Sequence, residues 1–178
     1  MTNLADRCRR VKLLICDVDG VLTDGSINLS TDGVETKRFH VRDGSAIKLW
    51  TSSGGRIAWV SGRKSAAVER RAEELGVTIL FQGVSDKLPV VRRILADLAL
   101  TEEEYSFIGD DLPDLPAVSL AGLGVAVADA VPELRTAADY VTDAPGGTGA
   151  VRETIEMLLK AQGAWDAVVA RYSAQASG

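Results

Sequence analysis

The chain has 178 residues, of which 46% are hydrophobic and 25% are charged, which is the usage of an ordinary folded protein. This composition excludes a disordered, collagen-like or disulfide-rich chain, and a net charge of -5 offers no basic surface for nucleic acid. Only two cysteines occur, and no apolar run approaches the roughly 20 residues that span a bilayer. We therefore expect one domain, residues 1–178, that works in the cytoplasm without a membrane or nucleic-acid partner.

Short apolar runs alternate with helical patterns along most of the chain. The runs are typical of strands buried on both faces of a parallel sheet, and they cover Val11–Cys16, Arg56–Val60, Val77–Phe81, Tyr105–Ile108 and Leu123–Ala126. Helical patterns occur at Ala46–Thr51, Ser65–Leu75, Leu88–Leu98, Ala150–Ala161 and Trp165–Tyr172. Strands that alternate with helices at this spacing predict the α/β class, with a doubly wound parallel sheet. The last residues, 173–178, are expected to form a disordered tail.

One segment interrupts the alternation directly after the first expected strand. Two extended arms within residues 26–39 flank the turn Ser30-Thr-Asp-Gly33, which predicts an inserted β-hairpin. An isolated hairpin is only marginally stable in water, so this one must pack against its own domain or against the same hairpin of a neighbouring subunit. We favour the neighbouring subunit.

Polar residues gather at the ends of the expected strands, where open α/β sheets bind their ligands. They are Asp17 and Asp19 after the first strand, Ser61 after the second, Lys87 after the third, and Asp110, Asp111 and Asp114 after the fourth. Carboxylates that converge at one edge repel one another unless a cation lies among them, and ligands that are all oxygen favour Mg²⁺. Because Mg²⁺ in proteins is often shared with phosphate oxygens, the pattern indicates phosphate chemistry.

The two aspartates that follow the first strand can divide the work of such a reaction. If Asp17 faces phosphorus beside the cation, its carboxylate can act as the nucleophile and form an acyl phosphate. Asp19 would then act as acid toward the leaving oxygen and as base toward water. Ser61 and Lys87 would bind the phosphoryl oxygens that do not bridge to the leaving group.

The ordered motifs resemble those of haloacid-dehalogenase-type phosphatases. They are Asp17-Val-Asp19-Gly20-Val-Leu-Thr, Ser61-Gly-Arg, Lys87 and Gly109-Asp110-Asp111. A narrower resemblance, from about Val11 to about Gly163, is to the subfamily that acts on 3-deoxy-D-manno-octulosonate 8-phosphate (KDO 8-phosphate). It is carried by Asp17–Gly25, Arg42-Asp-Gly44, Gly62-Arg-Lys64, Gly109–Leu112, Val125-Ala-Val-Ala-Asp-Ala130 and Gly149-Ala-Val-Arg-Glu153.

The resemblance implies a Rossmann-like domain without a cap, assembled as a homotetramer in which the hairpins form a central barrel and neighbouring subunits close the site. It also implies that Mg²⁺ is held by the Asp17 and Asp110 carboxylates and the Asp19 backbone carbonyl. The substrate contacts that it implies are His40, Arg42, Asp43, Gly44, Lys48, Gly62, Arg63 and Arg71. The short spacing between the motifs independently leaves no room for a folded lid.

Three positions depart from the pattern of this subfamily and bear on the substrate. His40 stands where bacterial members are expected to have Asn, Lys48 where some have Arg, and Thr148 where a Gly-Gly-Arg-Gly turn has Arg. A nine-carbon sugar-acid 9-phosphate is therefore the alternative substrate.

Other readings of the same residues stay open at the level of sequence. A non-catalytic receiver domain also gathers carboxylates and a lysine, but its lysine would follow the acidic pair rather than precede it. A catalytically silent regulatory or assembly copy of the fold would show a broken motif, and every motif is present. Asp111 and Asp114 could complement the dipole of a helix from its first turn, or surround the cation and Lys87. Arg63 and Arg71 could pair with nearby glutamates on the helix surface.

Overall fold

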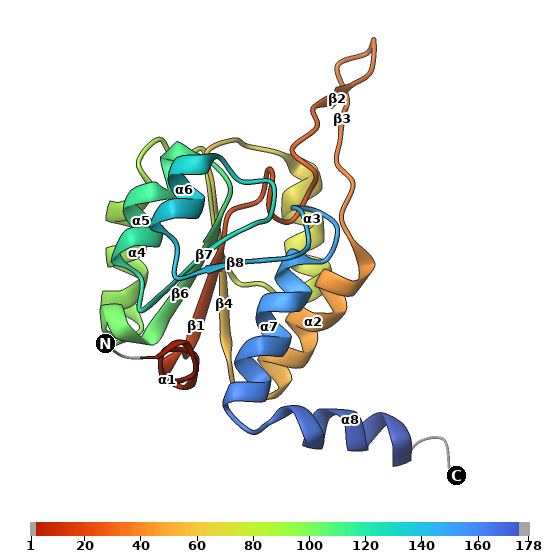
Figure 1. Ribbon diagram of the computed structural model, residues 1–178. Coiled ribbons are helices and arrows are strands. Elements are labelled where there is room, and N and C mark those ends of the chain that lie inside the picture. The colour runs from red at the N-terminus through yellow and green to blue at the C-terminus, as the bar shows by residue number, and fades with distance from the viewer. Residues whose placement is uncertain (1–2, 175–178) are drawn as a thin grey trace.

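A six-stranded parallel sheet forms the centre of the molecule in the computed structural model, which describes residues 3–174 (Figure 1). Its strand order is β5-β4-β1-β6-β7-β8, and every neighbouring pair is parallel. The strands are β1 (Leu13–Cys16), β4 (Arg56–Ser61), β5 (Ile79–Gln82), β6 (Tyr105–Gly109), β7 (Leu123–Ala126) and β8 (Tyr140–Val141). All residues of β1, β6 and β7 are buried, which explains why their sequences are continuous apolar runs rather than alternating ones.

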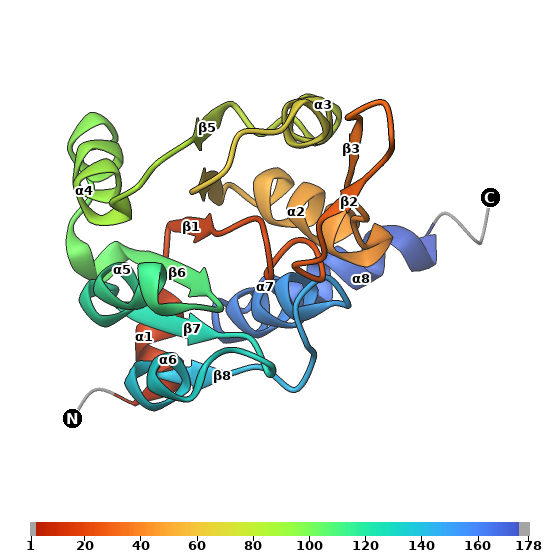
Figure 2. The same cartoon turned by 90° about the horizontal axis from the view of Figure 1, so that it is seen from above.

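Helices cover both faces of the sheet, as the doubly wound prediction requires. In the view from above, α4, α5 and α6 lie on one face, and α2 and α7 lie on the other (Figure 2). The helices are α1 (Leu4–Arg10), α2 (Val41–Ser52), α3 (Ala66–Leu75), α4 (Lys87–Asp97), α5 (Leu115–Leu120), α6 (Pro132–Ala137), α7 (Ala150–Ala161) and α8 (Trp165–Ala174), with two short 3-10 turns, Glu102–Glu104 and Leu112–Asp114. None of the helices within residues 3–174 is both long enough and apolar enough to cross a membrane.

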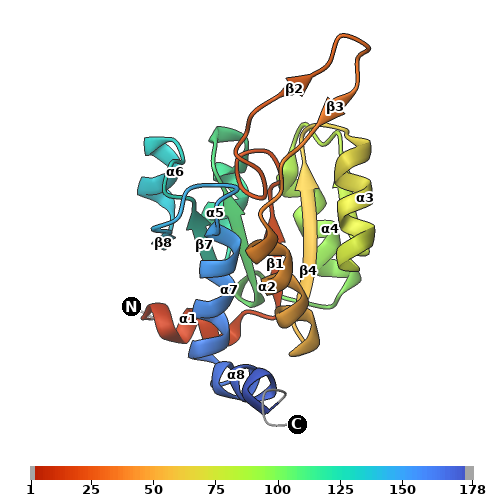
Figure 3. The same ribbon diagram turned by 90° about the vertical axis from the view of Figure 1, so that its right-hand side faces the viewer.

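The predicted hairpin is present and projects beyond the upper edge of the sheet (Figure 3). Its strands β2 (Asn28–Leu29) and β3 (Glu35–Thr36) are antiparallel and form a sheet of their own. No other folded unit is inserted between the strands of the described chain, so the expected absence of a cap domain is confirmed. The tip of the hairpin leaves Ile27, Leu29 and Val34 more than half exposed.

The start of α2 differs from the sequence prediction. This helix begins at Val41, five residues before the expected start at Ala46. Gly44 in its first turn weakens the helical signal of the sequence, and the N-cap residue His40 makes no capping hydrogen bond through its side chain. As a result, Asp43 and Gly44, which precede the expected helix, lie on its first turn. Of the tail expected at 173–178, residues 173 and 174 end α8 and the rest lie outside the described residues.

Candidate active site

The polar residues predicted at the strand ends meet at one edge of the sheet. Because β1 lies between β4 and β6, the residues that follow these strands become neighbours. Asp17 follows β1 and its backbone N–H donates to Ile108 at the end of β6, with 3.0 Å between nitrogen and oxygen. Ser61 ends β4, and Asp110 follows β6. The sheet order thus assembles the site from segments far apart in the sequence.

Lys87 forms the buried cationic centre of this site. Its ammonium lies 2.6 Å from Asp17 Oδ1 and 2.5 Å from Asp114 Oδ1. The side chains of all three residues are at most 8% exposed. Burial opposes the charge of Lys87, but the two carboxylates prevail and raise its pKa. The ion pair therefore keeps Lys87 charged and fixes the orientation of Asp17.

Three carboxylates, those of Asp17, Asp110 and Asp114, offer oxygen atoms within 4.8 Å of one another. Asp114 is already occupied, because one oxygen accepts from Lys87 and the other accepts from the backbone N–H of Asp110 at 3.1 Å. Asp17 and Asp110 remain with oxygens free for a cation. These two hydrogen bonds favour Asp17 and Asp110 over Asp114 as ligands of a cation.

The raised pKa values of Asp17 and Asp110 indicate that a cation bound between them would stabilise their carboxylate forms. Burial, together with the nearby carboxylates, raises the pKa of Asp17 to about 6 and that of Asp110 to about 8. A buried carboxylate and a half-buried one, both offering oxygen ligands, suit a hard divalent cation such as Mg²⁺. Gly20, with φ +93°, leaves the space for Asp110, since a Cβ atom there would lie 2.0 Å from Asp110 Oδ2. The residues present therefore fit the predicted metal.

Asp19 lies at the opposite side of the Asp17 turn, where it faces the base of the hairpin. One carboxylate oxygen, Oδ1, accepts a hydrogen bond from Lys37, and the other, Oδ2, lies 3.5 Å from the Ser61 hydroxyl. The side chain of Lys37 is 1% exposed, whereas that of Asp19 is 20% exposed. Sequence reasoning did not assign a role to Lys37. The available signal was that Lys37 lies on the same face of the hairpin arm as Glu35.

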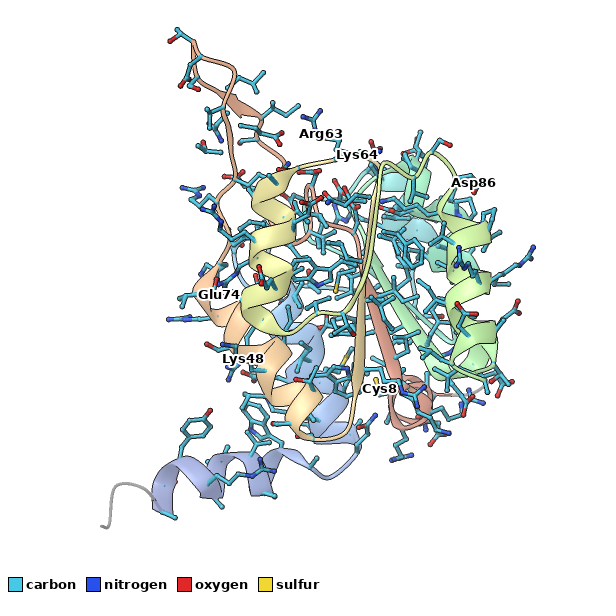
Figure 4. All side chains as sticks on the ribbon, turned by 180° about the vertical axis from the view of Figure 1, so that it is seen from behind. Cys8, Lys48, Arg63, Lys64, Glu74 and Asp86 are labelled. Atoms are coloured by element: carbon cyan, nitrogen blue, oxygen red, sulfur yellow. The ribbon has the colours of Figure 1, made fainter. Side chains whose placement is uncertain are left out.

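Arg63 and Glu35 add a second link between the hairpin and the sheet edge. Arg63 Nη2 donates to Glu35 Oε1 at 2.8 Å, and the same carboxylate lies 3.6 Å from the Lys37 ammonium. Arg63 therefore pairs with a hairpin glutamate and not with the helix glutamates considered from the sequence. Figure 4 shows Arg63 and Lys64 at the hairpin end of the molecule. Gly62 is exposed beside them.

The residues expected to contact substrate from α2 do not all face this edge. Arg42 is exposed on the first turn of α2. Lys48 is exposed further along the helix, well away from Arg63 (Figure 4). The Asp43 side chain is 1% exposed and its Oδ1 accepts from the backbone N–H of Arg152 at 2.7 Å, in the first turn of α7. Asp43 therefore links α2 to α7 through this hydrogen bond, and the substrate contact expected for it stays a prediction.

His40, Gly44 and Arg71 surround a small buried space behind the hairpin base. The guanidinium of Arg71 lies 5.9 Å from the centre of the Phe39 ring and pairs with Glu74 at 2.7 Å. Arg71 therefore forms an ion pair with a glutamate of its own helix, which was one of its two interpretations from the sequence. A Cβ atom at Gly44 would lie 2.3 Å from Arg71 Nη2, so a larger residue there would require the guanidinium to move. His40 Nδ1 is buried without a hydrogen-bond partner within the described residues.

The side chain of Asp111 caps the 3-10 turn that follows it. Its Oδ1 accepts from the backbone N–H of Leu112 at 2.7 Å at the start of the 3-10 turn, and its side chain is exposed. Asp114 forms the reciprocal half of this capping box. Thr148, one of the departures noted in the sequence, is exposed, and its hydroxyl donates to the Pro145 carbonyl oxygen at 2.7 Å.

The fold and the carboxylate-lysine site define a haloacid dehalogenase-like hydrolase, and the model of the family with that description matches residues 79–153. A 3-deoxy-D-manno-octulosonate 8-phosphate phosphatase of Escherichia coli K12 is 48% identical over 90% of this chain and 85% of its own length. That of Yersinia pestis is 46% identical over 90% and 86% of the two chains. The chain therefore belongs to the family of 3-deoxy-D-manno-octulosonate 8-phosphate phosphatases.

Solved structures of this family superpose closely on the chain. The phosphatase of Moraxella catarrhalis, in complex with magnesium ion, phosphate ion and KDO, has a TM-score of 0.93 and 42% identity, with 94% of this chain and 97% of that chain covered. The cobalt-bound phosphatase of Haemophilus influenzae has a TM-score of 0.86 and 40% identity, with coverage of 88% and 92%.

Proposed function

We propose that the protein is a magnesium-dependent phosphatase that hydrolyses KDO 8-phosphate to KDO and phosphate. The observation that carries the proposal is the pair formed by Asp17 and Asp110, whose carboxylate oxygens come within 4.8 Å of each other while the buried ammonium of Lys87 pairs with Asp17. The similarity to KDO 8-phosphate phosphatases over nine-tenths of the chain indicates which substrate is hydrolysed. A capless fold suits a small sugar-acid phosphate, which would enter an open sheet edge.

The first half of the reaction is assigned to Asp17. Its carboxylate oxygen attacks phosphorus, the bond from phosphorus to the sugar oxygen breaks, and an acyl phosphate remains on Asp17. Mg²⁺, held by Asp17, Asp110 and the Asp19 backbone carbonyl, would neutralise charge on the phosphoryl oxygens. Lys87, fixed by Asp17 and Asp114, adds positive charge at the same oxygens, and the Ser61 hydroxyl donates to another.

Asp19 moves the protons of both halves. As a carboxylic acid it gives its proton to the sugar oxygen that leaves, and becomes a carboxylate. In the second half it takes a proton from water, whose oxygen attacks phosphorus and releases Asp17. Asp19 then holds the proton needed for the next cycle. A residue that performs both transfers must be partly open to solvent, and the Asp19 side chain is 20% exposed.

Binding of the sugar acid is assigned to the exposed cations near the hairpin and to the start of α2. Arg63, with its side chain 45% exposed, and Arg42 are open to an incoming carboxylate. His40, Gly62 and Gly44 complete the assignment, with Arg71 behind them, and Lys48 remains the weakest member because of its distance from this edge. We assign Asp43 to positioning, through its hydrogen bond to α7.

The protein is further proposed to be a single domain that works as a homotetramer in the cytoplasm. The exposed apolar residues of the hairpin, Ile27, Leu29 and Val34, support assembly through this element, because an unpartnered hairpin gains stability when it packs against another. Two free, buried cysteines are consistent with a reducing compartment.

Phosphate release across a substrate panel tests the proposal. The panel contains KDO 8-phosphate, nine-carbon sugar-acid 9-phosphates and hexose phosphates, each assayed with Mg²⁺ and with a chelator. We expect strong preference for KDO 8-phosphate and no release with the chelator. Preference for a nine-carbon acid would instead make His40 and Thr148 determinants of substrate size, and no release from any member would identify a silent copy of the fold.

A further inference from the structure

Among the cationic side chains of residues 3–174 that form an ion pair, Lys37 is the most deeply buried outside the Lys87 cluster. Its side chain is 1% exposed, although it belongs to a hairpin whose tip is largely open to solvent. A buried lysine is costly unless its charge is compensated. The compensation comes from Asp19, which accepts a hydrogen bond from it, and from Glu35 at 3.6 Å.

The contact divides the two oxygens of Asp19 between different partners. Oδ1 is occupied by the Lys37 ammonium, whereas Oδ2 lies 3.5 Å from the Ser61 hydroxyl, at the end of β4. A carboxylate held at one oxygen by a buried ion pair has little freedom to rotate. Oδ2 is therefore the oxygen left to exchange a proton at the sheet edge.

The hairpin base is itself fixed to the site by a second ion pair. Arg63 donates to Glu35 at 2.8 Å, and Glu35 lies two residues before Lys37 on the same strand arm. The chain of contacts from Arg63 through Glu35 and Lys37 to Asp19 joins the loop after β4 to the loop after β1. Lys37 is thus held in place from both sides.

We propose that Lys37 is a positioning residue for proton transfer: it holds Asp19 Oδ1 so that Oδ2 gives a proton to the leaving oxygen and later takes one from water. The inference rests on the proposed phosphatase function. It assigns a catalytic consequence to the hairpin in addition to any part in assembly, because the hairpin delivers the ammonium that orients the acid.

Two substrates distinguish this role from a general loss of structure. The alkoxide of a sugar needs a proton as it leaves, whereas 4-nitrophenolate leaves from 4-nitrophenyl phosphate without one. The second half of the reaction, in which Asp19 takes a proton from water, is common to both. A protein with a misplaced Asp19 should therefore form the acyl phosphate from the aryl substrate normally and then turn over slowly.

The experiment compares Lys37→Met, Lys37→Arg and a matched control, Arg38→Met. Arg38 follows Lys37 on the same arm and also pairs with an aspartate, Asp24, at 2.6 Å, but its side chain is 77% exposed. We expect Lys37→Met to lower kcat for KDO 8-phosphate by about 10- to 100-fold, a part of the effect of general acid-base catalysis, with little change in KM. Lys37→Arg should recover part of kcat, and Arg38→Met should match the wild type.

Rapid mixing with 4-nitrophenyl phosphate supplies the decisive readout. For Lys37→Met we expect a burst of 4-nitrophenolate at the wild-type rate, followed by a slow steady state. Burst and steady rates that fall together would overturn the proposal, because they would indicate a disrupted site rather than a misplaced acid. A wild-type kcat in Lys37→Met would overturn it as well. The proposed phosphatase function fails separately, if the wild-type protein releases phosphate from neither substrate.

Discussion

Lys87 and Asp17 form an ion pair at 2.6 Å in a site from which water is largely excluded, since their side chains are 5% and 8% exposed. The pair shares its cation with Asp114, so one lysine compensates two buried carboxylates. Removing one partner of a buried ion pair costs far more than the pair contributes, because an uncompensated charge remains. The cluster that prepares the nucleophile is therefore also a structural element.

We expect Lys87→Met to destabilise the protein by roughly 3–5 kcal/mol at neutral pH, because the Asp17 and Asp114 carboxylates lose their cation. Urea denaturation of the metal-free protein measures the change. Lys12→Met is the matched control: Lys12 pairs with Glu104 at 2.6 Å but its side chain is 64% exposed, so about 0–1 kcal/mol is expected. Equal losses in the two variants would contradict the burial argument.

The metal-free protein should become more stable as the pH is lowered from about 8 toward about 6. Burial raises the pKa of Asp110 to about 8, so the folded protein binds this proton more tightly than the unfolded chain does. The penalty on the fold is therefore largest above about pH 8, and it shrinks as the proton binds below that pH. Bound Mg²⁺ stabilises the carboxylate form, so the dependence should disappear at saturating Mg²⁺.

Urea midpoints in chelator at several pH values measure this effect. Asp110→Asn should flatten the profile and raise the midpoint at pH 8, while phosphate release is lost. Asp24→Asn serves as a control, because the hydrogen bond from the backbone of Ser26 lowers the pKa of that exposed carboxyl. A metal-free wild-type protein that loses stability between pH 8 and pH 6 would contradict the role given to Asp110.

The elements that the sequence predicted well are those whose burial is decided locally. Continuous apolar runs identified five strands of the sheet, and three of these, β1, β6 and β7, are buried at every residue, as expected for strands covered on both faces. The end of α3 was equally clear, since Gly76 adopts the left-handed conformation, with φ +73°, that favours glycine. Helices α5 and α6 and strand β8 were not predicted, because six or fewer residues leave too little periodicity to detect.

The residues of the candidate site likewise divide into those that the sequence predicted and those that it did not. Asp17, Ser61, Lys87 and Asp110 were predictable because parallel strands bring their carboxyl ends to one edge. Lys37 was not, since its burial depends on how the hairpin arm packs against Asp19. This ion pair depends on tertiary packing. A lysine on a hairpin arm is otherwise expected to be exposed to solvent.

Assembly should depend on the apolar tip of the hairpin. Leu29 is 67% exposed and Val34 54% exposed, on opposite arms of the turn. We expect the double variant Leu29→Glu, Val34→Glu to shift the protein from a tetramer to smaller species in light scattering, because like charges would meet in the interface. Val169→Glu, at a 46% exposed residue of α8, is the control and should leave the mass unchanged. A wild-type monomer would remove the basis of the proposed assembly.

Covalent catalysis by Asp17 makes the most restrictive prediction. Asp17→Asn keeps the shape of the side chain but removes the nucleophilic charge, so phosphate release should be lost completely. Because the pKa of Asp17 is raised by burial and by Asp114, replacing a strained carboxylate with a neutral amide should not unfold the protein. Thermal melting and phosphate release, measured on the same preparation, test both halves. Asp111→Asn is a matched control from the exposed cap of the 3-10 turn and should retain most of the activity. Turnover by Asp17→Asn would exclude the acyl phosphate and leave direct attack by water as the mechanism.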